Sequence, residues 1–237
     1  MHATNAATDA ARHTRNAQWR AFFDRSAAVH DGSYRTSGHA NRYSFNRQAR
    51  LLSRAFTAGP ATAMLDAGCG TDGVAEPFAR TGTRVVGIDY SIGSVARAPR
   101  HGLRAVGGDL LRLPIRDECF ARVASVGVIQ HFDDPAPMLR ELFRVTRPGG
   151  ELVIATTNAE CIAVRLHRLV QRVFRRRNDF SRLFTAGELL ALTNETGWRA
   201  AEWVTASRRH PAATKPPLIT RMAAPTLAVR LQREEGR

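Results

Sequence analysis

The sequence has few cysteines and no long apolar run. Its three cysteines, Cys69, Cys119 and Cys161, show neither the paired spacing of a disulfide framework nor that of a metal site. We therefore expect reduced thiols, a cytoplasmic location and no bound metal. No apolar run reaches the ~18 residues that a membrane-spanning helix needs. Residues 1–18 also lack the apolar core of a signal peptide.

Lysine is almost absent as well. Lys215 is the only one, and arginine supplies nearly all of the formal net charge of +14. Such a charge fits nucleic acid or an anionic membrane as a partner. Abundant arginine and alanine, however, are typical of a bias toward GC-rich codons. Because Arg175–Arg177 is the only tight cluster, we interpret most of the charge as a solvated surface and keep nucleic acid as the less favoured partner.

The chain of 237 residues, 43% of them hydrophobic, suits one α/β domain with additions. Residues 1–16 are polar and alanine-rich and predict a disordered tail. Residues 17–59 contain two helical patterns, the first with Trp19, Phe22 and Phe23 on its apolar face. In residues 60–237 short apolar strands alternate with helices, which predicts a parallel sheet with right-handed crossovers. The alternation is interrupted at residues 159–184 by a long amphipathic insertion.

This insertion carries an apolar and a basic side at helical spacing. The apolar side is Ile162, Leu166, Val170 and Val173, and the basic side is Arg165, Arg168, Arg172 and Arg176. Two interpretations stay open: a helix packed on the edge of the sheet, or a substrate cap over the strand ends.

A glycine turn follows the first predicted strand. Gly68, Gly70 and Gly73 stand directly behind Asp66 and match the pattern G-x-G-x-x-G, which alone is a weak signal. Glycine adopts positive φ and lets the backbone approach a ligand closely. A strand, a glycine turn and a helix N-terminus together favour a nucleotide-like ligand.

Three carboxylates narrow the class of ligand. Asp66, Asp89 and Asp109 stand at the ends of three successive predicted strands. A carboxylate at the second strand end can accept both ribose hydroxyls, and one at the third can accept from an adenine amino group. Because like charges repel, the three together favour a neutral or cationic adenosine ligand over a pyrophosphate.

Four stretches then resemble, in order and spacing, the motifs of class I S-adenosylmethionine-dependent methyltransferases. They are MLDAGCGTDG, VVGIDYS, GDLLRLPIRDECFARVASVGVIQHFDDP and LRELFRVTRPGGELVIATTN. The resemblance covers about residues 45–205 and is nearest to the branch that includes quinone and natural-product methyltransferases. It implies a Rossmann-like, mostly parallel sheet of seven strands in the order 3-2-1-4-5-7-6, with the last strand antiparallel and helices on both faces. It also implies an N-terminal helical lid.

The resemblance implies S-adenosylmethionine as cofactor and a set of site residues. From the methionine end through the ribose to the adenine, the expected set is Asp66, Gly68, Cys69, Gly70, Asp89, Tyr90, Asp109 and Leu110. Val126 and His131 border the methyl-transfer mouth, where His131 is either a general base or acceptor-orienting group, or a packing histidine that shapes the loop. Tyr34 is expected in the lid. Asp72 stands where many members have a third glycine, and we expect the turn to survive because aspartate tolerates left-handed backbone.

The function predicted is methyl transfer to a small organic acceptor, in secondary-metabolite or cofactor biosynthesis. Oxygen is the expected acceptor atom, with carbon and nitrogen open. A tRNA wobble-uridine methyltransferase is one alternative, since SVGVIQHF and RLFTAGELLAL look somewhat like that group. A non-catalytic cofactor-binding partner subunit is another, suggested by Asp72. The sequence leaves the oligomeric state open.

Overall fold

A computed structural model describes most of the chain. The described residues are 17–30, 42–56, 63–71, 73–98, 103–174, 182–205, 209–211 and 215–235. The predicted tail at 1–16, Tyr34, Asp72 and Arg175–Arg177 lie outside them, so the predictions made for these residues remain predictions.

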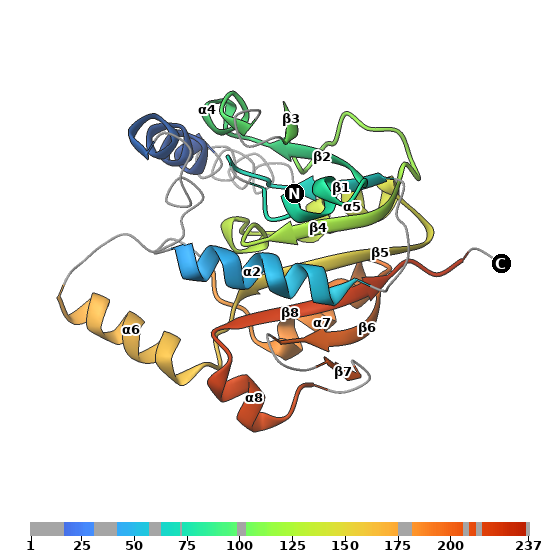
Figure 1. Ribbon diagram of the computed structural model, residues 1–237. Coiled ribbons are helices and arrows are strands. Elements are labelled where there is room, and N and C mark those ends of the chain that lie inside the picture. The colour runs from blue at the N-terminus through green and yellow to red at the C-terminus, as the bar shows by residue number, and fades with distance from the viewer. Residues whose placement is uncertain are drawn as a thin grey trace, which may run out of the picture.

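An eight-stranded sheet forms the centre of the protein, in the order β3-β2-β1-β4-β5-β8-β6-β7 (Figure 1). The strands are β1 Ala63–Ala67, β2 Arg84–Asp89, β3 Arg104–Gly107, β4 Phe120–Val126, β5 Thr146–Thr157, β6 Arg199–Val204, β7 Arg209–Pro211 and β8 Thr226–Gln232. Strands β1 to β5 pair in parallel, whereas β8 runs antiparallel to both β5 and β6.

This sheet confirms the predicted fold class, with one strand added. The predicted order 3-2-1-4-5-7-6 corresponds to β3-β2-β1-β4-β5-β8-β6, and β8 is the antiparallel last strand. The additional strand is β7, which pairs antiparallel to β6 at the edge of the sheet, with Trp203 opposite His210. A strand of three residues that ends in a proline carries no period-2 pattern, so the sequence did not predict it.

Helices cover both faces of the sheet (Figure 1). The α-helices of the described residues are α2 Arg42–Ala55, α3 Glu76–Arg80, α4 Ile92–Val95, α5 Ala136–Val145, α6 Ile162–Val173, α7 Ala186–Glu195 and α8 Leu218–Ala223, and residues 17–30 are also helical; α6 and α8 lie beside the sheet rather than on its faces. Helices α5 and α7 contact each other; α5 also contacts β5, and α7 also contacts β6. Helix α2 contacts α3, β6 and β8.

The central strand β5 shows why the sheet is buried on both faces. Leu152 and Ile154 belong to one core cluster and Val153 and Ala155 to the other. Successive side chains of a strand point to opposite faces, so this continuous apolar run supplies both layers. Parallel sheets covered by helices on both sides have such runs.

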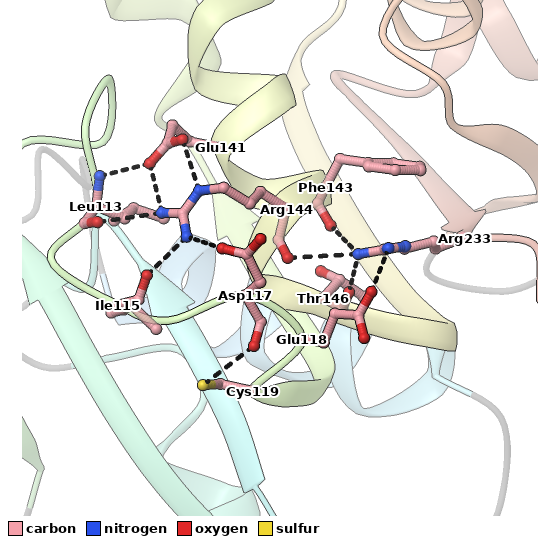
Figure 2. A network of polar contacts seen from close by, with 10 residues as sticks. All are labelled: Leu113, Ile115, Asp117, Glu118, Cys119, Glu141, Phe143, Arg144, Thr146 and Arg233. Atoms are coloured by element: carbon pink, nitrogen blue, oxygen red, sulfur yellow. Dashed lines mark hydrogen bonds and ion pairs between the residues drawn. The ribbon is translucent and has the colours of Figure 1, made fainter. Parts of the chain in front are cut away.

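An ion-pair network fastens the connection between β3 and β4 to the end of α5 (Figure 2). The Arg144 guanidinium donates to the carboxylates of Glu141 and Asp117 and to two loop carbonyls, and it lowers the pKa of Glu141. Arg233 donates to Glu118 and to backbone carbonyls between α5 and β5. The network lies where β4 begins, at the edge opposite the strand ends discussed below. It therefore stabilises the fold rather than the site.

Candidate active site

A pocket opens at the carboxyl ends of β1, β2, β3 and β4. Its empty space, including the solvent-filled mouth, is about 970 Å³, within the range of small-molecule sites. Nine of the eleven predicted site residues line it: Gly68, Cys69, Gly70, Asp89, Tyr90, Asp109, Leu110, Val126 and His131. Asp66 lies buried behind the turn rather than on the pocket wall, and Tyr34 is outside the described residues.

The glycine turn has the backbone geometry that the sequence indicated. Gly68, Gly70 and Gly73 have φ values of +81°, +58° and +58°. The backbone N–H groups of Gly68 and Cys69 both donate to the Ile88 carbonyl, which folds the turn back onto β2. A Cβ on Gly68 would lie 2.3 Å from a methyl carbon of Val128. Glycine is therefore required at position 68 for both conformation and space.

Asp89 joins the turn to the end of β2. Its Oδ2 accepts a hydrogen bond from the Gly70 N–H at 2.8 Å, and its Oδ1 accepts one from the Ser91 N–H at 2.8 Å. Burial raises the pKa of Asp89, while these two hydrogen bonds oppose the shift and the nearby charge of Asp24 adds to it. A carboxylate oxygen has two acceptor sites, so each oxygen can still accept from a hydroxyl in the pocket.

Asp66 is a buried carboxyl with a spare oxygen. Its Oδ2 accepts from the Ala75 N–H at 3.3 Å, and its Oδ1 has no hydrogen-bond partner among the described residues. Burial raises its pKa to about 7, with a smaller contribution from the Asp89 charge. A buried oxygen without a partner is unfavourable, so the site gains stability from a ligand that donates to it.

Asp109 and Leu110 follow β3 and face the same pocket. The Asp109 Oδ1 accepts from the Leu111 N–H at 2.9 Å, which fixes the carboxylate in a tight local turn. Leu110 is buried and supplies an apolar wall. The structure thus brings together the side chains expected at the adenine end and those expected at the ribose end.

The helix of residues 17–30 covers part of the pocket. Its Asp24 Oδ1 accepts from the Ser91 hydroxyl at 2.6 Å and from the Gly93 N–H at 2.9 Å. Its Arg20 guanidinium lies 5.2 Å from the centre of the Tyr90 ring. The helix is therefore fastened to the loop that follows β2, directly beside Asp89.

His131 ends a short 3-10 helix, η2 Ile129–His131, that follows β4. Its ring centre lies 4.1 Å from that of Trp19 and 5.5 Å from that of Phe23. Trp19 and Phe23 line the pocket too, although the sequence pattern had indicated them only as the apolar face of a helix. Periodicity identifies such a face but not what it packs against. Phe45 and Phe132 also line the pocket.

Cys69 lies in the glycine turn, where its surroundings keep the thiol protonated and so do not favour a role as a nucleophile. It is buried, its Sγ lies 3.5 Å from the Gly70 carbonyl, and burial raises its pKa. A protonated thiol is a weak nucleophile. Among the described residues, no cluster of His, Cys, Asp and Glu side chains could hold a metal ion.

Comparison with known proteins agrees with this geometry. Residues 65–154 match the model of a methyltransferase domain. The chain is 39% identical to a demethylmenaquinone methyltransferase of Streptomyces griseus over 113 residues. This matched stretch covers 45% of this chain and 49% of that protein. The chain thus spans about half the length of the relatives it matches.

Solved structures show the same fold. A possible histamine N-methyltransferase from Thermotoga maritima aligns over 80% of this chain and 90% of its own, with a TM-score of 0.62 and 20% identity. Geranyl diphosphate C-methyltransferase from Streptomyces coelicolor aligns over 84% and 83%, with a TM-score of 0.60 and 16% identity.

The sheet order and the strand-end pocket define a Rossmann-like protein that binds a nucleotide-like ligand. Residues 65–154 match a methyltransferase domain, and the fold and the relatives make the chain similar to the class I S-adenosylmethionine-dependent methyltransferases, whose cofactor is S-adenosylmethionine. In the described part of the chain, no helix has the length and apolar character needed to cross a membrane.

Proposed function

We propose that this protein transfers the methyl group of S-adenosylmethionine to a small aromatic or quinone-like acceptor in cofactor or secondary-metabolite biosynthesis. The observation that carries the proposal is the pair of carboxyls around the glycine turn. Asp66 has a spare buried oxygen, and Asp89 faces the pocket with both oxygens held in place. Two acidic groups at one turn suit a cationic ligand and oppose a pyrophosphate.

The residues present fit this cofactor. Asp89 would accept the ribose hydroxyls and Asp109 the adenine amino group, with Tyr90 and Leu110 beside the nucleoside. Asp66 and the turn from Gly68 to Gly70 would hold the methionine part. When bound, the cofactor supplies a methyl group on a sulfonium, which is a good leaving group. The protein then has to orient the acceptor and exclude water, and orientation can supply much of the rate acceleration.

The walls of the pocket support an apolar, flat acceptor. Trp19, Phe23, Phe45 and Phe132 line the pocket together with Val128. Aromatic side chains stack on flat rings, and the name of the Streptomyces griseus relative points to a quinone precursor. On a phenolic or reduced quinone ring, loss of the hydroxyl proton makes the oxygen nucleophilic and also enriches the adjacent ring carbon. We therefore expect methylation at oxygen, with ring carbon as the next candidate.

His131 is the proposed general base, and the helix of residues 17–30 the proposed lid. The His131 ring borders the pocket and contacts Trp19 of that helix, so closing the lid and positioning the ring are coupled. A histidine at this place can remove a phenolic proton near neutral pH. The helix also covers the pocket beside Asp89, where it would shield the bound cofactor from water.

The basic charge gives little support to a tRNA substrate. Several of the described arginines are paired with carboxylates: Arg144, Arg182, Arg199, Arg209, Arg221, Arg230 and Arg233. Such pairs stabilise the surface of the fold and leave fewer charges for phosphates. All three cysteines are free thiols, which supports the proposed cytoplasmic location.

The test is calorimetry with S-adenosylmethionine on the protein and on Asp89→Ala. Loss of the charged acceptor should weaken binding by about 1.5–3 kcal/mol. Glu195→Ala, which removes an exposed carboxylate at the end of α7, is the matched control and should bind like wild type. NAD should not compete. Unchanged affinity in Asp89→Ala would overturn the ribose assignment.

Turnover is measured separately, by mass spectrometry with a panel of phenols, reduced quinones and amines. A mass increase of one methyl group on a phenol or hydroquinone supports the proposed acceptor class, and fragmentation locates it on oxygen or carbon. Tight cofactor binding with no methylated product from any member of the panel would instead support a non-catalytic partner subunit.

A further inference from the structure

Helix α6 faces the protein with its polar side and exposes its apolar side. Its half-buried residues are Val164, Arg168 and Gln171, and none of its residues is fully buried. Six apolar side chains on and directly after it are 46–70% exposed: Ile162, Leu166, Leu169, Val170, Val173 and Phe174. The predicted amphipathic helix is therefore present, but its apolar side does not pack on the sheet edge.

Helix α8 contacts α6 and likewise exposes apolar side chains. Leu218 and Ile219 are 61% and 79% exposed, whereas Thr220 and Arg221 are half-buried. The Arg221 guanidinium forms an ion pair with Glu160, just before α6. Figure 1 shows the two helices beside the main sheet rather than on its faces. Two neighbouring helices thus leave large apolar side chains uncovered, and such patches mark interaction sites.

The charges at the border of this surface have one sign. Arg165 and Arg172 are exposed and stand four residues before and three residues after Leu169, so they flank the apolar side. Helix α6 contains no Asp or Glu, and three further arginines follow it in the sequence at Arg175–Arg177. Long arginine side chains can lie along an apolar surface while their charged ends reach an anionic layer.

The insertion also begins and ends beside the pocket. It leaves the carboxyl end of β5, where Asn158 forms a bridge to Phe184, and it returns at Arg182, whose N–H donates to the Gln130 carbonyl. Gln130 belongs to η2, the same short helix that carries His131. The exposed apolar helix and the mouth of the pocket are therefore at the same edge of the sheet.

We propose that the exposed sides of α6 and α8 dock on the surface of an anionic lipid bilayer. An amphipathic helix with apolar residues on one side and arginines at its border lies in the plane of such an interface. The 12 residues of α6 span about 18 Å, too short to cross the ~30 Å hydrocarbon layer. The charge complements anionic headgroups, each arginine near the surface strengthening the attraction.

The same charges disfavour a second copy of this chain on this surface. Two copies packed through the exposed side of α6 would bring Arg165 and Arg172 of each near those of the other, and like charges repel in an interface. If the proposed function holds, docking at this edge would let an acceptor with a lipid tail pass from the bilayer into the pocket. Docking itself does not depend on that activity.

The experiment is flotation of the full chain with vesicles, without cofactor or acceptor. Vesicles of equal parts phosphatidylglycerol and phosphatidylcholine should bind the protein, pure phosphatidylcholine far less, and high salt should release it. Removing two charges in Arg165→Gln with Arg172→Gln should weaken binding about thirtyfold. The matched control is Arg116→Gln with Arg140→Gln, which removes two exposed arginines elsewhere and should keep most of the binding.

A second pair of variants tests the apolar side. Leu166→Gln should lower vesicle binding about tenfold, whereas Val106→Gln, a similarly exposed position on the edge strand β3, should not. Each variant is checked for a wild-type melting temperature and circular dichroism spectrum. Three results would overturn the proposal: no binding to anionic vesicles, an equal loss of binding in both arginine pairs, or a dimer that Leu166→Gln dissociates. The proposal would also fail if an acidic protein bound this surface to saturation while lipid vesicles did not bind at all.

Failure of the proposed function would appear in a different measurement. Turnover of a water-soluble phenol without vesicles should be the same in wild type and in Leu166→Gln. With an acceptor embedded in vesicles, the variant should be slower. A protein that binds vesicles but methylates neither acceptor would support docking and contradict the activity, and the reverse result would contradict docking alone.

Discussion

Asp24 and Ser91 form a hydrogen bond beside the pocket, although they are 67 positions apart in the chain. The Asp24 Oδ1 accepts from the Ser91 hydroxyl at 2.6 Å and also from the Gly93 N–H. Ser91 in turn donates its N–H to Asp89. The helix of residues 17–30 is therefore coupled to the carboxylate expected to bind the ribose, through one serine.

Asp24→Ala should loosen this helix and weaken cofactor binding about tenfold, because two hydrogen bonds to a charged acceptor are lost. Hydrogen exchange should show residues 17–30 protected by the cofactor in wild type and much less protected in the variant. Arg25→Gln changes an exposed residue of the same helix and should behave like wild type. Equal protection with and without cofactor would contradict the lid.

Asp66 should make the stability of the cofactor-free protein depend on pH. Its pKa in the fold is about 7, against an ordinary value of 3.8, so the folded state keeps a proton that the unfolded chain has already lost. The free energy of unfolding should therefore fall as pH rises from about 4 to about 7, and level off above, by about 4 kcal/mol at most. Asp89, whose pKa is also raised, acts in the same direction.

Asp66→Asn keeps the shape of the side chain and removes its titration, so urea unfolding of this variant should show a weaker dependence on pH. Binding gives an independent measure. If the cationic part of the cofactor pairs with ionised Asp66, binding below pH 7 should release a proton, which calorimetry in buffers of different ionisation enthalpy detects. A pH dependence of stability that is the same in wild type and Asp66→Asn would contradict the assignment.

Gly68 should tolerate no side chain, for two separable reasons. The backbone of Gly68 has φ of +81°, a conformation that a residue with a side chain rarely adopts, and an added Cβ would lie 2.3 Å from a Val128 methyl carbon. We expect Gly68→Ala to destabilise the protein by about 2–4 kcal/mol, combining backbone strain with overpacking. Gly82→Ala, at φ of +91° with no atom within 4 Å of the added Cβ, measures the strain alone and should lose about 1–2 kcal/mol.

Val128→Ala should then partly rescue Gly68→Ala, because it removes the methyl groups that the new Cβ meets. A double-mutant cycle by urea unfolding should give a coupling of about 1 kcal/mol or more between the two positions. Purely additive effects would show that space around Gly68 is not limiting.

The strand-end carboxylates were predictable because the fold brings them together by a simple rule. Parallel strands end at one edge, so Asp89 and Asp109 meet the glycine turn without further information. Asp24 was not predictable, since it stands on an amphipathic helix with no local signature, and its partner is fixed only by tertiary packing. For the same reason Trp19 was identified as an apolar helix face but not as part of the pocket wall.

The insertion shows a further limit of the sequence. The spacing of Leu166 and Val170 correctly predicted an apolar side, but periodicity does not say whether that side meets the protein or the solvent. In the structure the half-buried Val164, Arg168 and Gln171 determine the orientation. Helix α8 was missed because one and a half turns give too short a pattern to distinguish from a loop.

The role of His131 separates two accounts of the chemistry. If it removes the acceptor proton, His131→Ala should lower the turnover number about 10²-fold while cofactor affinity barely changes. The rate should then fall below about pH 6.5, where a free histidine protonates. If His131 only supports Trp19 and Phe23, which its ring contacts, the loss should appear in the Michaelis constant of the acceptor, with a flat pH profile. His131→Phe keeps an aromatic ring there without a titrating nitrogen, so it should restore the Michaelis constant but not the turnover number.

The acidity of the acceptor provides the decisive comparison. A nitrophenol is largely ionised at neutral pH and needs no base, so its turnover should change little in His131→Ala, whereas that of an unsubstituted phenol should fall by the full factor. This difference arises only if the histidine moves a proton, because a packing defect would slow both acceptors alike. Equal losses for both phenols, together with rescue of turnover by His131→Phe, would assign the chemistry to orientation alone and His131 to the aromatic wall.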